Sequence, residues 1–310
     1  MTTIALTGAT GFIGRHLMSE LPKRGYKIRA LLRRPADVAL QCDSAVIGDL
    51  ARPQNLSAAF VDVDAVVHSA GIAHAMSGVP ADDYRAINTE ATVSLARAAA
   101  RSGARRFVFL SSIRAQSGPS SDVALTEELE ARPTDDYGRS KLAAEQELAK
   151  LDHDWVSLRP TLVYGPGVKG NMAALVALAR SPYPLPLGGL TAQRSLVALD
   201  NLVDAVAHVL GSPAPLRRPF IVADPQPLTV GEMVAAMRAA AGRRPGLIPV
   251  PEWLLKATLR AAGRGEWIDR LCSPLVASSA ALQAQGWSPR VQTPAGLAAL
   301  MRMDAAQDPH

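Results

Sequence analysis

The sequence has little of what marks several classes of protein. Two of its 310 residues are cysteine, too few for the disulfide framework of a small secreted domain. No uninterrupted apolar stretch approaches the roughly 18 residues of a membrane span, so we expect none. The first residues show no basic segment followed by a cleavage site, so a cytoplasmic protein is the expectation.

Lysine and aromatic residues are also scarce. Lysine and arginine together number 33, most of them arginine, and aromatic residues make up 5% of the chain. The basic residues are scattered and are not interleaved with aromatic residues, so we expect no nucleic-acid partner despite the net charge of +5. The excess of arginine suits an anionic small substrate. The histidines show no spacing typical of a metal site.

What remains is the composition of an ordinary globular protein, with 48% apolar and 20% charged residues. Over the first 160 residues, short and wholly apolar runs alternate with longer helical patterns. Such runs are typical of strands buried on both faces of a parallel sheet, so we predict a doubly wound α/β fold. The predicted strands are Thr3–Thr7, Lys27–Leu32, Ala45–Ile47, Ala65–Ser69, Phe107–Ser111, Val156–Arg159 and Phe220–Ala223.

The pattern changes after Arg159, where turn residues become frequent and the remainder is mostly helical. We therefore predict two domains: residues 1–164 with 199–223, and a smaller lobe of residues 165–198 with 224–310. The helix predicted near Glu252–Gly263 carries Trp253 beside basic residues. It either packs on the core of the smaller lobe, which we favour and which makes Trp253 a core residue, or touches a membrane surface.

A glycine-rich loop follows the first predicted strand and opens the first predicted helix. Its residues are Gly8, Ala9, Thr10, Gly11, Phe12, Ile13 and Gly14. A dinucleotide pyrophosphate needs backbone N–H groups at a helix N-terminus and no Cβ in its way. The loop is therefore a candidate for binding NAD or NADP, and the alternative is a tight turn with packing glycines.

The second predicted strand bears on the choice between these coenzymes. An acidic residue for the ribose diol is expected about 20 residues after the loop, but the region reads Leu31-Leu32-Arg33-Arg34. Arg33 suits a 2′-phosphate, which favours NADP, unless it stacks on adenine or faces solvent. Asp49, followed by Leu50, is a candidate for the adenine amino group or an ordinary loop residue.

Three further residues predict the chemistry. Tyr137 and Lys141 stand four residues apart in a predicted helix and share a face. A nearby ammonium stabilises the phenolate, so the tyrosine can act as a base. Ser111 and Ser112 end the fifth predicted strand, at the edge of the sheet where ligands bind, so the Ser112 hydroxyl can orient a substrate oxygen.

These motifs, with Asn88 and the segment Arg159–Gly167, resemble the extended short-chain dehydrogenase/reductases, which have a Rossmann-type sheet. The resemblance is closest to the NAD-dependent epimerase/dehydratase group, near bacterial UDP-hexose 4-epimerases. It covers most of the chain and is much less specific for the substrate than for the superfamily. It implies a homodimer paired through two helices, Tyr84–Ser102 and Tyr137–Leu151, and a UDP-sugar substrate.

The resemblance also implies site residues. Ser112, Tyr137 and Lys141 are the expected catalytic set, and Arg114, Asn171 and Arg194, with Ser112, are expected to contact substrate. Further cofactor contacts are expected at Ser69, Ala70, Gly71, Asn88, Ser111, Pro160, Thr161 and Val163.

The sequence departs from the family in ways that bear on the reaction. Family dehydratases carry an Asp-Glu pair after the catalytic hydroxyl residue, whereas Ile113-Arg114 stands here, which argues against dehydration. We expect a nucleotide-sugar 4-epimerase. The first alternative is an NAD(P)H-dependent reductase or dehydrogenase of a nucleotide sugar or another carbonyl compound. The second is a coenzyme-binding sensor without catalysis.

Overall fold

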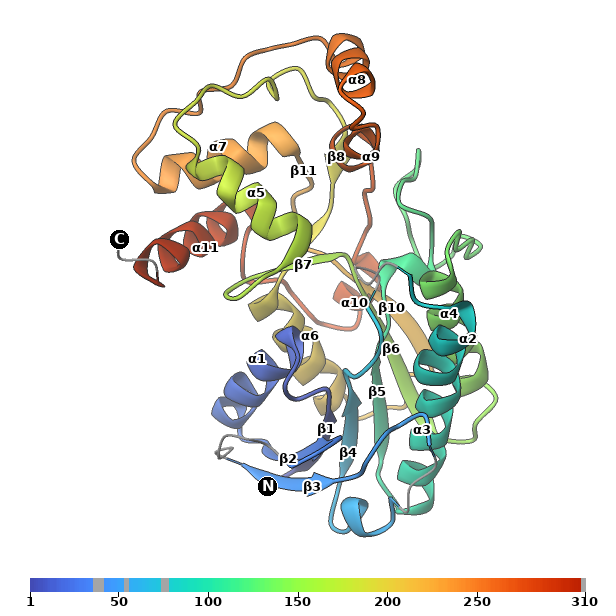
Figure 1. Ribbon diagram of the computed structural model, residues 1–310. Helices are drawn as coiled ribbons and strands as arrows, with labels where there is room; N and C mark the ends of the chain where they lie inside the picture. The colour runs from blue at the N-terminus through green and yellow to red at the C-terminus, as the bar shows by residue number, and fades with distance from the viewer. Residues whose placement is uncertain (36–41, 53–55, 74–77, 308–310) are drawn as a thin grey trace. The chain divides into compact units, whose positions relative to one another are not determined.

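Figure 1 shows the computed structural model, which describes residues 1–35, 42–52, 56–73 and 78–307. The chain forms two compact units, and each is built from three separate segments. The first unit comprises Met1–Gly118, Glu127–Pro160 and Leu202–Ile221, and the second comprises Pro119–Thr126, Thr161–Asn201 and Val222–His310. Residues 119–126, which we expected in the first domain, thus belong to the second unit.

A seven-stranded sheet is the centre of the first unit. In spatial order its strands are β10 (Arg218–Val222), β6 (Asp154–Pro160), β5 (Arg106–Leu110), β4 (Ala65–His68), β1 (Thr3–Thr7), β2 (Lys27–Leu32) and β3 (Asp43–Val46). The pairs from β3 through β6 run parallel. Because the strand order reverses next to β1, the carboxyl end of β1 is where a doubly wound sheet binds its ligand. The predicted Rossmann-type α/β class is confirmed.

Helices cover both faces of this sheet (Figure 1). One face carries α3 (Ala91–Arg101) and α4 (Asp136–Leu148), and the other carries α1 (Phe12–Glu20) and α6 (Leu199–Gly211). The core beneath α3 and α4 includes Leu95, Leu148, Phe107 and Phe109, all with 0% exposure. Burial of each such side chain contributes about 1.5–3 kcal/mol, which fixes the position of α4 on the sheet.

One predicted helix of the first unit is interrupted. The predicted helix over residues 84–102 consists of α2 (Ala81–Tyr84), a π-helical turn η3 (Arg85–Glu90) and then α3. Asn88 is fully buried in that turn. A π-helical turn within an α-helix is rare and frequently lies at a functional site.

The second unit is mostly helical. Its helices are α5 (Gly170–Arg180), α7 (Val230–Ala240), α8 (Glu252–Ala261), α9 (Glu266–Cys272), α10 (Ala280–Gln283) and α11 (Thr293–Gln307). Two short strand pairs, β7 (Leu162–Tyr164) with β9 (Leu196–Ala198) and β8 (Gln193–Arg194) with β11 (Leu228–Thr229), accompany them. Side chains of α5, α7 and α11 form the core of this unit.

Helix α8 does not bury the residues that we expected. Leu255 is 7% exposed and faces the core, whereas Trp253 is 71% exposed. The helix thus packs through one leucine-bearing side and leaves the tryptophan outside, and the expectation that Trp253 belongs to the core is wrong.

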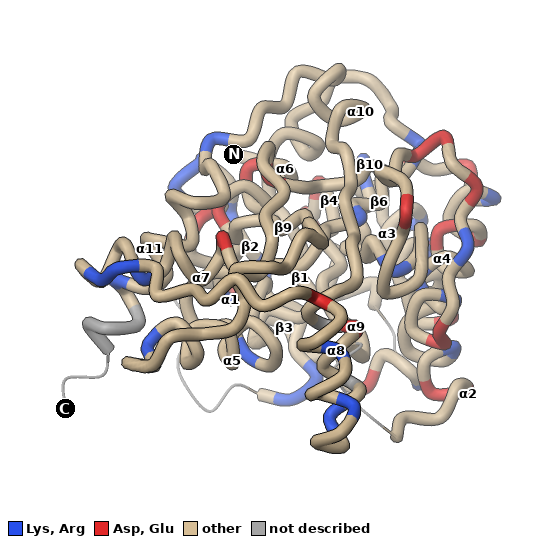
Figure 2. Tube along the Cα trace, turned by 90° about the horizontal axis from the view of Figure 1, so that it is seen from above, with Lys and Arg blue, Asp and Glu red and all other residues tan. Residues whose placement is uncertain are grey.

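Among the residues described, no helix combines the length and apolarity that crossing a bilayer requires. Acidic and basic residues are interleaved along α4 (Figure 2).

Candidate functional site

The glycine loop joins β1 to α1 in a conformation that its glycines make possible. Gly8 has φ +70°, and a Cβ there would lie 2.7 Å from the Ala70 nitrogen. The Gly11 N–H donates to the Gly8 carbonyl over 2.9 Å, and no side chain caps the N-terminus of α1. At Gly14 a Cβ would overlap the Gly8 carbonyl oxygen. The loop therefore presents an uncapped helix N-terminus with no side chain at these positions, which fits a pyrophosphate.

The segment after β4 lies beside this loop. The Ala70 N–H donates to Thr7 Oγ1 over 3.3 Å, which ties this segment to the end of β1. A Cβ on Gly71 would lie 2.7 Å from Asn88 Oδ1 and 3.4 Å from Lys141 Nζ. The structure thus brings together Gly71, Asn88 and Lys141, three residues that the sequence predicts for the cofactor site.

Asn88 connects the same segment to α4. Its Oδ1 accepts a hydrogen bond from the Ile72 N–H over 2.9 Å, and its Nδ2 donates to the Ile72 carbonyl and to Ser140 Oγ, each over 3.1 Å. With these contacts the side chain is held within the protein. In this structure Asn88 therefore positions the chain after β4.

His68, the last residue of β4, lies directly before this segment and is tied to its neighbours by hydrogen bonds. Its ring nitrogens lie 2.6 Å from Thr7 Oγ1 and 2.9 Å from Thr92 Oγ1, and its ring stacks on Phe109. Complete burial, with a smaller effect of the Lys141 charge, lowers the pKa of His68 to about 3. The imidazole is therefore neutral at physiological pH and serves to connect β1, β4 and α3.

Ser112, Tyr137 and Lys141 meet at the carboxyl end of β5. The Ser112 hydroxyl and the Tyr137 phenol form a hydrogen bond. Lys141 Nζ donates to the Leu110 carbonyl over 3.0 Å and lies 4.5 Å from the centre of the Phe109 ring. The three predicted catalytic side chains thus belong to one unit, with Ser112 just after β5 and the other two on α4.

Burial changes the acidity of two of these groups. It raises the pKa of the Tyr137 phenol, an effect that the Ser112 hydrogen bond opposes. It lowers the pKa of Lys141 to about 8, although the charge of Glu145 opposes this. The pKa of the Lys141 ammonium is therefore closer to neutral pH than it would be in water, so this group can exchange a proton at the pH of the cell.

A buried ion pair between Glu145 and Arg159 connects α4 to β6. Arg159 Nε donates to both carboxylate oxygens of Glu145 over 3.1 Å, and Arg159 Nη1 donates to Gln116 Oε1. Both charged side chains are at most 5% exposed. The pair joins α4 to β6 one turn beyond Lys141. Glu145 and Gln116 were not predicted from the sequence.

Arg114 is engaged within the first unit. Its guanidinium forms an ion pair with Asp135, the residue that caps the N-terminus of α4. The predicted contact with substrate stays a prediction. Asp135 was not predicted as a site residue, although an Asp directly before a helix is a signal for an N-cap.

The predicted adenine region contains a second ion pair. Arg33 Nη2 lies 2.8 Å from Asp49 Oδ2, with the two side chains 68% and 35% exposed. Asp49 and Leu50 also line a small hollow together with Ile47 and residues of α3. Arg33 is thus free of the sheet core and can reorient toward a ligand.

Ser111 has a buried hydroxyl with no hydrogen-bonding partner among the described residues. Because an unpaired buried hydroxyl is costly, it suits a partner such as a bound coenzyme. Together with the glycine loop, it indicates that the first unit fits a dinucleotide.

Three further predicted cofactor contacts follow one another closely along the chain, at the end of β6 and just after it. Pro160 ends β6 in the first unit, and Thr161 follows it in the second, where its N–H donates to the Val222 carbonyl over 3.0 Å. Val163 is part of β7. They stay predictions as cofactor contacts.

Two predicted substrate contacts belong to the second unit. Asn171 is exposed near the start of α5. Arg194 Nη1 donates to the Ser273 carbonyl over 2.6 Å, and its Nη2 donates to the Pro119 carbonyl over 3.3 Å. The guanidinium is therefore already oriented by backbone carbonyls before any ligand binds.

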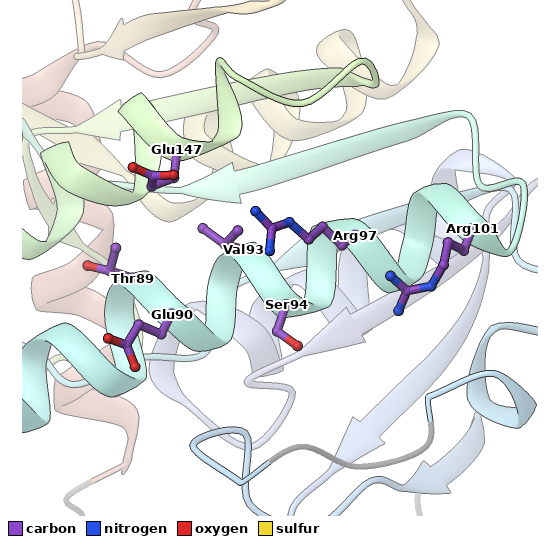
Figure 3. Close-up of a pocket in the computed structure, with 7 residues that line it drawn as sticks. All are labelled: Thr89, Glu90, Val93, Ser94, Arg97, Arg101 and Glu147. Carbon is purple, nitrogen blue, oxygen red and sulfur yellow. The ribbon is translucent and has the colours of Figure 1, made fainter.

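A hollow of about 440 Å³ lies elsewhere, on the surface formed by η3, α3 and α4 (Figure 3). Its lining residues are Thr89, Glu90, Val93, Ser94, Arg97, Arg101 and Glu147. None of these is a predicted site residue. The hollow carries charges of both signs on one helical face.

Comparison with known proteins identifies the family. A family model described as "NAD dependent epimerase/dehydratase family" matches residues 4–222. The chain belongs to this family. It is therefore an NAD(P)-dependent enzyme of the epimerase and oxidoreductase type, and it acts on a small molecule.

Individual family members show the range of reactions. The chain is 36% identical to a UDP-glucose 4-epimerase of Vibrio cholerae over 301 residues, which cover 93% of this chain and 90% of the relative. It is 31% identical to a ceramide reductase of Caulobacter vibrioides, over 67% of this chain and 59% of that one. A solved structure of MoeE5 with UDP-glucuronic acid and NAD matches 99% of this chain and all of that one, with a TM-score of 0.77 and 25% identity.

Proposed function

We propose that this family member is a nucleotide-sugar 4-epimerase that uses Tyr137 as its base. The observation that carries the proposal is the meeting of Tyr137, Lys141 and Ser112 beside the segment that follows β4. The similarity to the Vibrio cholerae UDP-glucose 4-epimerase, which extends over nine-tenths of both chains, supports the substrate class.

The chain's own residues divide the work of the reaction. A bound nicotinamide coenzyme would supply a reversible acceptor for the hydride at C4 of the sugar. Tyr137 takes the proton from the sugar O4 and gives it back, while Ser112 donates a hydrogen bond to that oxygen. The positive charge of Lys141, one turn away on the same helix, would favour the phenolate of Tyr137.

Other predicted residues hold the two ligands. The N-terminus of α1, the glycines of the loop and Ser111 would hold the coenzyme. Asn171 and Arg194 would hold the phosphates of the nucleotide sugar, since the guanidinium of Arg194 can bind phosphate oxygens at two points.

The test uses purified protein, a bound or added coenzyme, and a UDP-hexose. An epimerase interconverts the two 4-epimers with no net change in the nicotinamide absorbance. Tyr137→Phe should lose about 10²–10⁴-fold in turnover, as expected for a general acid–base group. Tyr183→Phe is the matched control, because Tyr183 is 73% exposed. Wild-type turnover by Tyr137→Phe would refute the role of the phenol.

A reductase is the second candidate, since a ceramide reductase and a 2-alkyl-3-oxoalkanoate reductase are among the relatives. It would use the same three residues but consume NADPH in proportion to the carbonyl substrate. We propose a preference for NADP because of Arg33. Its guanidinium, which pairs with Asp49, could instead bind the 2′-phosphate of NADP. Arg33→Gln should then weaken NADP binding and leave NAD binding unchanged in calorimetry.

Association as a homodimer through α3 and α4 is part of the proposal. Arg97, Arg101, Glu90 and Glu147 place both charge signs on this surface (Figure 3), and a two-fold axis lets one copy's arginine meet the other's glutamate. Light scattering of the wild type and of Arg101→Glu tests this: the wild type should be a dimer, and the variant should dissociate more readily.

A further inference from the structure

We propose that Arg114 and Asp135 act as an ion pair that positions Tyr137 and balances the charge around it. The proposal rests on the role of Tyr137 proposed above. Neither residue touches the reacting atoms in this scheme, so both are positioning residues.

The pair closes a ring of contacts around the start of α4. The Arg114 backbone N–H donates to Ser112 Oγ over 3.1 Å, so the segment after β5 holds the hydroxyl that bonds to Tyr137. The Arg114 guanidinium reaches Asp135 Oδ2, and Asp135 Oδ1 accepts the Gly138 N–H over 2.7 Å. Ser112 and Tyr137 are thus linked twice, once directly and once through the ion pair.

Close packing makes this arrangement stiff. A Cβ at Gly138 would overlap the Arg114 carbonyl oxygen, so the backbone after β5 lies directly against the first turn of α4. The Arg114 and Asp135 side chains are only 12% and 27% exposed. An ion pair so shielded is screened less by solvent and salt than a surface pair.

The two charges act on the phenol in opposite directions. Besides burial, which raises the pKa of Tyr137 most, the Asp135 carboxylate and the neighbouring Tyr84 raise it, and the Arg114 guanidinium lowers it. Lys141 lies one turn further along α4 and adds a second positive charge. Arg114 therefore offsets part of the effect by which Asp135, the cap of the helix, raises the pKa of the phenol.

The test measures the phenol directly in the coenzyme-free protein. A fluorinated tyrosine, whose phenol is more acidic, is incorporated at position 137 and titrated by fluorine NMR. Arg114→Gln leaves Asp135 unneutralised and should move the titration to higher pH. Asp135→Asn keeps a capping side chain but leaves Arg114 unpaired, and it should move the titration to lower pH. The double variant should lie between the two.

A matched control is available one residue further along. Asp136 and Arg139 form an ion pair of the same type on the exposed side of α4, with side chains 48% and 55% exposed. Asp136→Asn and Arg139→Gln should leave the titration of position 137 unchanged. At neutral pH, Arg114→Gln should turn over a UDP-hexose roughly tenfold more slowly than wild type, with the midpoint of its pH profile moved upward.

The outcomes separate this proposal from its alternatives. If Arg114→Gln raises only the KM for substrate and no titration moves, Arg114 is a substrate contact and the proposal is overturned. Shifts in the same direction for both single variants would also overturn it. Opposite shifts in a protein that turns over no nucleotide sugar would support the ion pair and refute the proposed function.

Discussion

Replacing Lys141 with methionine should make the folded protein more stable. Lys141 is 5% exposed, and burial lowers its pKa from 10.5 to about 8. At pH 7 the side chain is charged in both the folded and the unfolded state. The difference between its two pKa values therefore lowers the free energy of unfolding by about 3 kcal/mol. The variant leaves the Leu110 carbonyl without its partner, which costs about 1 kcal/mol. The net expected gain is about 2 kcal/mol.

The pH dependence tests the cause of this gain. As pH rises through 8, folded Lys141 loses its proton, and above 10.5 the unfolded chain loses it too. The difference in unfolding free energy between wild type and Lys141→Met should therefore be largest below pH 8 and decrease between pH 8 and 10.5. Urea unfolding of the coenzyme-free protein, followed by circular dichroism at several pH values, measures it.

A lysine just after the C-terminus of α4 provides the control. Lys150 is 67% exposed and pairs with Glu147, so Lys150→Met should change stability by less than about 0.5 kcal/mol. If Lys141→Met is less stable than wild type at pH 7, or if its advantage persists at high pH, the electrostatic reasoning is refuted. The same variant should lose most of its turnover.

Three further outcomes are expected. Gly14→Ala should weaken coenzyme binding at least about tenfold, because the added Cβ would meet a carbonyl oxygen, whereas Gly265→Ala, with open space around it, should bind normally in calorimetry. Trp253→Ala should leave the melting temperature nearly unchanged, while Trp287→Ala, at a site 4% exposed, should lose about 3–5 kcal/mol; equal losses would contradict the packing. Because the pKa of His68 is lowered in the folded state, its contribution to stability is present above pH 6.5 and is lost as pH falls toward 3. Between these pH values the unfolding free energy of wild type should fall by up to about 1.4 kcal/mol per pH unit. In His68→Gln this fall should be smaller.

The sheet could be predicted because its strands are apolar throughout. Thr3–Thr7 and Lys27–Leu32 have the predicted bounds, and no end of the other predicted strands differs by more than two residues. Wholly apolar runs are distinctive where both faces of a sheet are covered. The π-helical turn around Asn88 was not predicted, because helical periodicity in the sequence does not show where one extra residue enters a turn.

The second unit shows where periodicity fails. Helix α5 carries apolar residues over most of its surface, so no polar face distinguished it from a loop-rich segment. For α8, Trp253 was expected in the core, whereas tertiary packing buries Leu255 and leaves Trp253 exposed.

The candidate site was partly predictable for a related reason. Tyr137 and Lys141 are near neighbours in sequence, so their spacing alone places them on one face of a helix. The partners of Arg114 and Arg159 are carboxylates 21 and 14 residues away. Such pairings depend on how strands and helices pack, which local sequence does not reveal.

The division of each unit into three segments restricts how relatives can recombine. Exchanging the second unit for that of another family member requires replacing residues 119–126, 161–201 and 222–310 together. A single crossover in the gene between β6 and β10 would leave β10 from one parent beside β6 from the other. New substrate preferences in this chain are therefore expected to arise through point changes, and not through the transfer of one contiguous cassette.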